Sequence, residues 1–167
     1  MLSFQTFRRV PMMIEAFGHT AYYTWRAVDR ATVKKIQHVT QDFVRQGLIP
    51  EPAMHIDDMH MSIIRTENEI PTYTPDKQTI HVRAKEWRLL GGHPNYYLVL
   101  ICDLHPRVDR QVHTAAHLGA KFVFKGFLPH ISVAQYKTNK VDVTDLPLPS
   151  FTITLEAEEV VQFNDNM

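Results

Sequence analysis

The sequence predicts an α+β fold in which two antiparallel sheets line a central groove and the helices lie on the outside. Three observations predict it. A strand-like segment, a segment with helical spacing and a strand that carries a histidine follow one another, and this series occurs twice. The strand-like segments alternate apolar and polar residues, as sheets with one covered face do. With 167 residues, the chain is expected to be a single domain of two pseudo-symmetric lobes over residues 1–167.

The first lobe begins with β-favouring aromatic residues at 21–25, which predict a strand. Apolar residues then recur at helical spacing, with Asp29 placed to cap the helix and Gly47 to end it. Residues 59–64, MHMSII, alternate and predict a second strand. Residues 66–75 contain prolines and few large apolar side chains, so they predict a loop, which is a candidate cover for a site.

The second lobe begins with two apolar segments, residues 78–90 and 96–104, whose glycine-containing connection predicts two strands joined by a hairpin-like turn. Residues 106–120 place apolar side chains on one helical stripe behind a proline that suits a first helical turn. Residues 128–136 alternate and predict a strand. After a turn-rich segment, residues 151–163 predict a last strand with acidic side chains on one face.

Composition limits the partners of the chain. Basic and acidic residues balance at 18 each, so no overall field attracts nucleic acid, and duplex DNA is not an expected partner. Cys102 is the only cysteine, which excludes a disulfide framework and favours a reducing compartment, the cytoplasm. No apolar run approaches the roughly 18 residues that cross a membrane, so no membrane partner is expected. The sequence indicates no oligomeric state.

A pattern of histidine, any residue, serine and an apolar residue occurs as His60-Met61-Ser62-Ile63 and as His130-Ile131-Ser132-Val133. In a strand, residues i and i+2 share a face, so each motif presents an imidazole beside a hydroxyl. Two such pairs facing each other would bracket one phosphate, with one imidazole as base, the other as acid, and the hydroxyls donating to non-bridging oxygens. This chemistry requires no metal and no cofactor.

A third match, His38-Val39-Thr40, lies in the predicted first helix. There, positions i and i+2 point about 200° apart, so the two side chains cannot act together. His38 is therefore expected to lie on the surface.

With its two motifs, the chain resembles the 2H phosphoesterases over residues 21–163. The resemblance implies the bilobed, LigT-like fold of that family and metal-independent cleavage of phosphodiesters or cyclic phosphates. It implies that His60 and His130 are the acid-base pair and that Ser62 and Ser132 donate to the phosphate. Serine stands in both motifs where many members have threonine, which leaves the hydroxyl in place.

Within this family, the size of the chain, its acidic last strand and the tryptophan between the motifs are most similar to the phage anti-CBASS nucleases. Those enzymes destroy cyclic oligonucleotide second messengers of bacterial immunity. The resemblance implies a cyclic di- or trinucleotide substrate, cleaved at 3′-5′ bonds through attack by a ribose 2′-hydroxyl, in the host cytoplasm. It favours Trp87 and one of Tyr22 and Tyr23 as rings that stack on bases, and Glu158, which is expected to share a polar face with Glu156, as an acceptor.

Two other functions stay open: cleavage of 2′,3′-cyclic phosphates at RNA ends by the same chemistry, and sequestration of a nucleotide without cleavage. Positive charge near the phosphate could come from four basic residues that the sequence does not orient: Arg65, Arg83, Lys85 and Lys125. His113 and His117 are spaced as metal ligands on a helix, but no third ligand accompanies them and a polar helix face explains both. No metal site is expected.

Overall fold

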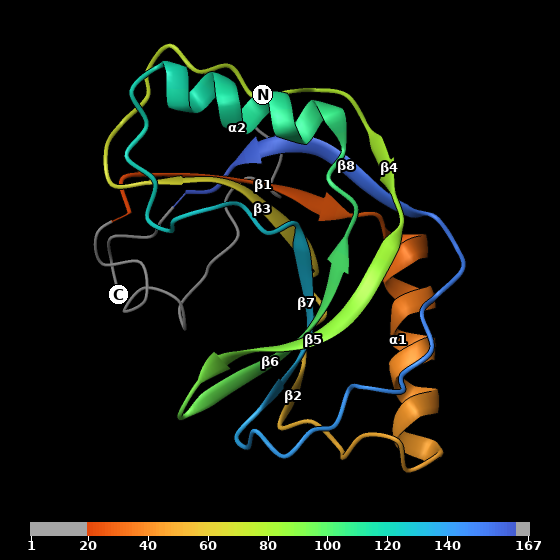
Figure 1. Ribbon diagram of the computed structural model, residues 1–167. Helices are drawn as coiled ribbons and strands as arrows, with labels where there is room; N and C mark the ends of the chain where they lie inside the picture. Colours follow the sequence, from red (N-terminus) through yellow and green to blue (C-terminus); the bar gives the residue numbers. More distant parts are fainter. Residues whose placement is uncertain (1–19, 163–167) are drawn as a thin grey trace.

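The computed structural model describes residues 20–162, which form two helices and two sheets (Figure 1). In chain order the elements are β1 (Tyr22–Val28), α1 (Arg30–Arg45), β2 (Met54–His55), β3 (His60–Thr66), β4 (Ile80–Val82), β5 (Ala84–Gly92), β6 (Asn95–Cys102), α2 (Pro106–His117), β7 (His130–Tyr136) and β8 (Ile153–Val160). The series of strand, helix and histidine-bearing strand therefore occurs in both halves.

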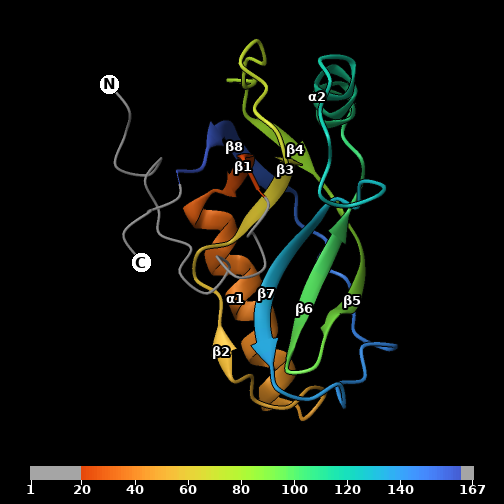
Figure 2. The same cartoon turned by 90° about the vertical axis from the view of Figure 1, so that its left-hand side faces the viewer.

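Each sheet has four strands, and every pairing is antiparallel. Sheet A has the order β3-β1-β8-β4, and sheet B has the order β2-β7-β6-β5. The predicted α+β class with two antiparallel sheets is confirmed. The motif strands β3 and β7 lie in different sheets and contact each other where the sheets meet (Figure 2).

The predicted strand over residues 78–90 is wrong in its extent, because the structure divides it into β4 and β5 at Arg83. β4 pairs with β8 in sheet A, whereas β5 pairs with β6 in sheet B, so the chain passes from one sheet to the other at this residue. The apolar positions Ile80, Val82 and Ala84 keep one alternation across the break. The residue pattern therefore does not mark it.

Helix α1 begins and ends at the predicted residues. The Asp29 carboxylate accepts a hydrogen bond from Thr32 N at 2.9 Å, which caps the first turn. Gly47 follows the helix with a φ of +73°, a left-handed conformation that glycine adopts without strain. Phe43 on the buried face packs edge-on against Trp87 of β5, with ring centroids 5.6 Å apart. Helix α1 therefore packs against sheet B beside β5 (Figure 1).

Helix α2 starts with Pro106, and the His105 side chain caps it by accepting a hydrogen bond from Arg107 N at 3.0 Å. The helix contacts β3 and lies over sheet A, with Val108 and Ala115 buried beneath it (Figure 1). Neither helix in residues 20–162 is long and apolar enough to cross a membrane.

The motif strands β3 and β7 each contain a β-bulge directly after the motif serine. In β3 the extra residue is Ile63, and in β7 it is Val133, as shown by one-residue jumps in the pairing with β1 and with β6. A bulge reverses the alternation of side chains beyond it. It therefore returns Arg65 in β3 and Gln135 in β7 to the face that carries the motif histidine and serine.

Candidate active site

The two motifs present their histidine and serine side chains away from the protein core. His60 and Ser62 are partly exposed, and so are His130 and Ser132. The apolar motif residues are buried and belong to one continuous core: Met61, Ile63, Ile131 and Val133. The imidazoles and hydroxyls of both strands therefore lie on the side opposite that shared core, which we call the motif face.

Backbone hydrogen bonds hold the motif strands alongside each other on both flanks. Before the first motif, Ile56 N donates to Val133 O at 3.2 Å, next to the pairing of β2 with β7. Beyond the first motif, Val123 N donates to Arg65 O at 2.9 Å, so the segment that leads to His130 runs along β3. These bonds, together with the contact between β3 and β7, join the two motifs into one region.

The two motif histidines have the same backbone anchor. His60 Nδ1 lies 2.8 Å from Asp58 O, and His130 Nδ1 lies 2.7 Å from Leu128 O, in each case the carbonyl two residues upstream. A carbonyl oxygen only accepts hydrogen bonds, so Nδ1 carries the hydrogen in each ring. The neutral ring then has its lone pair on Nε2. Nε2 is therefore the atom that can accept or deliver a proton in both motifs.

His130 is suited to the role of a base. Burial lowers the pKa of His130 below its ordinary value, and the nearby positive charge of Arg88 adds to this effect, while the hydrogen bond to Leu128 O opposes it. A lowered pKa keeps the ring neutral at pH 7. Nε2 of His130 is then ready to accept a proton from an attacking hydroxyl.

Aromatic residues of β1 hold the first motif in place. The Trp25 ring lies against the His60 imidazole, with centroids 3.9 Å apart. The Tyr23 hydroxyl is 2.5 Å from Ser62 Oγ and 3.5 Å from His60 Nε2. Burial raises the pKa of Tyr23 to about 12, so the phenol stays protonated. Trp25 and the Tyr23 hydroxyl are therefore positioned to orient the motif side chains, a role that the residue pattern does not show.

Stacking of bases on Tyr22, Tyr23 or Trp87 is not supported by their placement. Tyr23 is 2% exposed, and Tyr22 lies on the opposite face of β1, in edge contact with Tyr73. Trp87 is 5% exposed, packs on Phe43 and donates from Nε1 to Pro147 O at 3.0 Å. The prediction for Trp87 is corrected: strand aromatic residues more often fill a core than bind a ligand, and Trp87 does so here.

Glu158 does not share a face with Glu156, because β8 contains a bulge between Leu155 and Glu158. The bulge turns Glu158 inward to 4% exposure, while Glu156 stays exposed. The buried carboxylate accepts hydrogen bonds from Thr24 Oγ1 at 2.5 Å, from Tyr73 Oη at 2.8 Å and from Asp76 N at 2.8 Å. Burial raises the pKa of Glu158, and these bonds oppose the rise. Glu158 is therefore a structural carboxylate instead of the predicted nucleotide acceptor.

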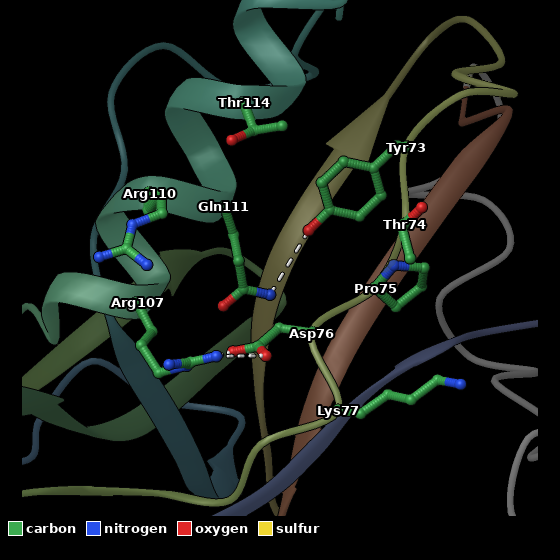
Figure 3. Close-up of a pocket in the computed structure, with 9 residues that line it drawn as sticks. All are labelled: Tyr73, Thr74, Pro75, Asp76, Lys77, Arg107, Arg110, Gln111 and Thr114. Carbon is green, nitrogen blue, oxygen red and sulfur yellow. Dashed lines mark hydrogen bonds and ion pairs between the residues drawn. The ribbon is translucent and has the colours of Figure 1, made fainter.

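A polar pocket of about 290 Å³ lies between α2 and residues 73–77 (Figure 3). Its carboxylate, Asp76, accepts hydrogen bonds from Arg107 and from the buried Arg26. Arg26 alternates along β1 with Trp25, which packs on His60, so this pocket and His60 lie on opposite faces of sheet A. The loop predicted over residues 66–75, a candidate cover for the site, contributes to this pocket and not to the motif face.

Within residues 20–162, no group of three or more histidine, cysteine, aspartate or glutamate side chains is arranged to hold a metal ion. His113, one of the two spaced histidines of α2, has Nδ1 2.8 Å from Asp109 O, one turn earlier in the same helix.

Replacement of Tyr23 by phenylalanine is expected to lower kcat for the phosphodiester cleavage expected of the two motifs about twofold to tenfold, because one hydrogen bond that orients Ser62 is lost. If Tyr23 acts through Ser62, Ser62→Ala in the Tyr23→Phe background should cost less than Ser62→Ala alone. Steady-state kinetics of the four proteins measure this, with Tyr96→Phe as the control. If the loss of kcat in the double variant equals the product of the two single losses, Tyr23 does not act through Ser62.

Comparison with known proteins finds only distant structural likeness. The chain matches no protein-family model, and a search of curated proteins finds no match. The similar solved structures include Usb1 of Kluyveromyces marxianus, with 8% identity, a TM-score of 0.47 and 74% of each chain covered, and E. coli LigT in its apo form. For LigT the identity is 13% and the TM-score 0.46, over 83% of this chain and 86% of that chain. At this distance, function has to be argued from the two histidine motifs.

Proposed function

We propose that this chain is a phosphodiesterase of the 2H type, in which His60 and His130 act as acid and base on one phosphate. The observation that carries the proposal is the repeated anchor: each motif histidine donates from Nδ1 to the carbonyl two residues upstream and presents Nε2 for proton transfer. A phosphodiester exchange needs one group to take a proton and another to give one. Two imidazoles in contacting strands supply both.

In the proposed reaction, His130 removes the proton from an attacking ribose 2′-hydroxyl, because its lowered pKa keeps Nε2 unprotonated. The 2′-oxygen bonds to the neighbouring phosphorus while the bond to the 5′-oxygen breaks, and protonated His60 delivers its proton to that oxygen. Ser62 and Ser132 donate hydrogen bonds to the non-bridging oxygens as charge develops. The product is a 2′,3′-cyclic phosphate, which water then opens with the two histidines in exchanged roles.

The substrate that we propose is a cyclic di- or trinucleotide of the kind that anti-CBASS nucleases remove in the host cytoplasm. The resemblance of the sequence to those phage enzymes supports this choice. The same two histidines would serve an RNA end with a 2′,3′-cyclic phosphate, so that substrate is the alternative to be tested beside it.

Incubation of the purified protein with a panel of cyclic di- and trinucleotides and one RNA with a 2′,3′-cyclic phosphate end tests the proposal, with products identified by mass. We expect linear products with cyclic or terminal phosphates from at least one cyclic oligonucleotide, and equal turnover in EDTA. If the protein opens the 2′,3′-cyclic phosphate of the RNA and cleaves none of the cyclic oligonucleotides, the alternative substrate is assigned. Tight binding with every ligand recovered intact would show sequestration and contradict the proposed chemistry.

The lowered pKa of His130 gives a pH dependence with a definite sign. A base must be unprotonated, so kcat/KM should fall as pH drops through the pKa of His130 in the free enzyme. Because that pKa lies below the ordinary histidine value, activity should persist at pH values at which an exposed histidine is already protonated. A pH profile of kcat/KM measures the inflection. An acid limb at or above 6.5 would contradict the assignment of His130 as base.

A further inference from the structure

Arg65 is brought to the motif face by the bulge in β3. Strict alternation from Ser62 would point Ile64, and not Arg65, to that face. The extra residue Ile63 shifts the alternation, so that both Ile63 and Ile64 are buried and Arg65 pairs opposite Tyr23. The Arg65 guanidinium carbon lies 5.8 Å from the centre of the Tyr23 ring, and the hydroxyl of Tyr23 is hydrogen-bonded to Ser62 Oγ. A positive charge is therefore placed beside the first motif, on the same face as its serine.

The Arg65 guanidinium is partly buried beside two aromatic rings and still carries its charge at neutral pH. Its carbon lies 4.8 Å from the centre of the Phe124 ring, so the group is placed against two aromatic rings. Burial lowers the pKa of Arg65 to about 10, which still leaves it protonated at neutral pH. Phe124 itself is 62% exposed, and its segment is tied to β3 by the bond from Val123 N to Arg65 O.

The second motif differs at the equivalent position. Its bulge brings Gln135, an uncharged residue, to the motif face, where Nε2 donates to Asn95 Oδ1 at 2.7 Å. The other three basic candidates, Arg83, Lys85 and Lys125, have exposed side chains outside the motif strands. Arg65 therefore supplies a positive charge from a motif strand itself, whereas the charge near His130 comes from Arg88 of β5, in the same sheet as β7.

We propose that Arg65 binds a second phosphate group of the substrate, next to the phosphate on which the histidines act. This inference rests on the proposed function and specifies its substrate class: a nucleotide chain or ring with at least two phosphates. Aromatic rings contact the faces of a guanidinium, whereas its N–H donors lie in its plane, where they match two phosphate oxygens. Arg65 lies three positions after Ser62 along the strand, a span of at most about 10 Å. Neighbouring phosphates of a nucleic acid chain lie within that reach.

Binding of two deoxydinucleotides tests the proposal without hydrolysis, because they lack the 2′-hydroxyl nucleophile. The probes are dTdT, with one phosphate, and the same dinucleotide with a 5′-phosphate, and calorimetry gives Kd for each. The wild-type protein is expected to bind the two-phosphate probe about tenfold more tightly, as a charge-assisted contact of about 1.4 kcal/mol would give. Arg65→Gln should remove the difference, Arg65→Lys should restore part of it, and Phe124→Ala should reduce it.

Arg110→Gln is the matched control, because it removes the same charge from the exposed surface of α2, on the other side of sheet A. It should leave the preference for two phosphates intact. A preference that persists in Arg65→Gln, or is absent from the wild-type protein, would overturn the inference. The outcome is separate from the proposed function: an Arg65-dependent preference without cleavage of any ribonucleotide in the panel would keep the phosphate subsite and remove the phosphodiesterase.

Discussion

Replacement of His60 or His130 by alanine is expected to reduce hydrolysis by about 10²- to 10⁴-fold in each single variant. Each ring supplies one of the two proton transfers, and alanine can neither take nor give a proton. Because the two transfers belong to one reaction, the double variant should lose little more than the worse single variant. Initial rates on the cleaved cyclic oligonucleotide measure these losses, with the unfolding midpoint of each variant as the check on folding.

His38→Ala is the matched control for the histidine variants. His38 belongs to a third His-x-Ser/Thr pattern, but it is exposed on helix α1. A helix does not place residues i and i+2 on one face, so His38 has no hydroxyl beside it from this pattern. Its replacement should leave the rate unchanged within about twofold, since surface substitutions away from special contacts have small effects. Full turnover by folded His60→Ala or His130→Ala protein would refute the two-histidine mechanism.

The secondary structure follows from the sequence where short-range physics decides it. The carboxylate of Asp29 and the glycine at Gly47 mark the ends of α1, because capping and left-handed backbone depend on neighbouring residues. The alternation in residues 60–63 and 130–133 correctly orients the histidines and serines relative to the apolar residues. These features require no knowledge of distant contacts.

The candidate site depends on bulges, which the sequence does not reveal. A bulge arises from pairing with another strand, and it reverses every face assignment beyond the extra residue. Glu158 is turned inward by the bulge in β8, and Arg65 is turned to the motif face by the bulge in β3. The prediction that Trp87 stacks on a base has a related problem. The side of the sheet to which Trp87 points is set by the passage of the chain into sheet B and by its contact with Phe43 of α1, and both depend on distant residues.

The buried Arg26 is expected to make the largest single polar contribution to stability on the face of sheet A that α2 covers. Its side chain is 0% exposed and donates to Gln78 O at 2.5 Å, to Glu156 O at 3.1 Å and to side chains on two other elements. Those partners are Asp76 Oδ2 at 2.6 Å and Gln111 Oε1 at 3.0 Å. Methionine would fill much of the volume but would leave one carboxylate, two backbone carbonyl groups and the Gln111 amide oxygen without this donor.

Arg26→Met is therefore expected to lower the free energy of unfolding by about 3–5 kcal/mol, the range for breaking one side of a buried ion pair. Urea unfolding followed by fluorescence measures the loss. Arg107 also bonds Asp76 but is more exposed, so Arg107→Met should cost less than Arg26→Met. Arg110→Met, on the exposed face of α2, should change stability by no more than about 0.5 kcal/mol. Equal losses in Arg26→Met and Arg110→Met would show that the buried cluster does not hold residues 73–77 and α2 against sheet A.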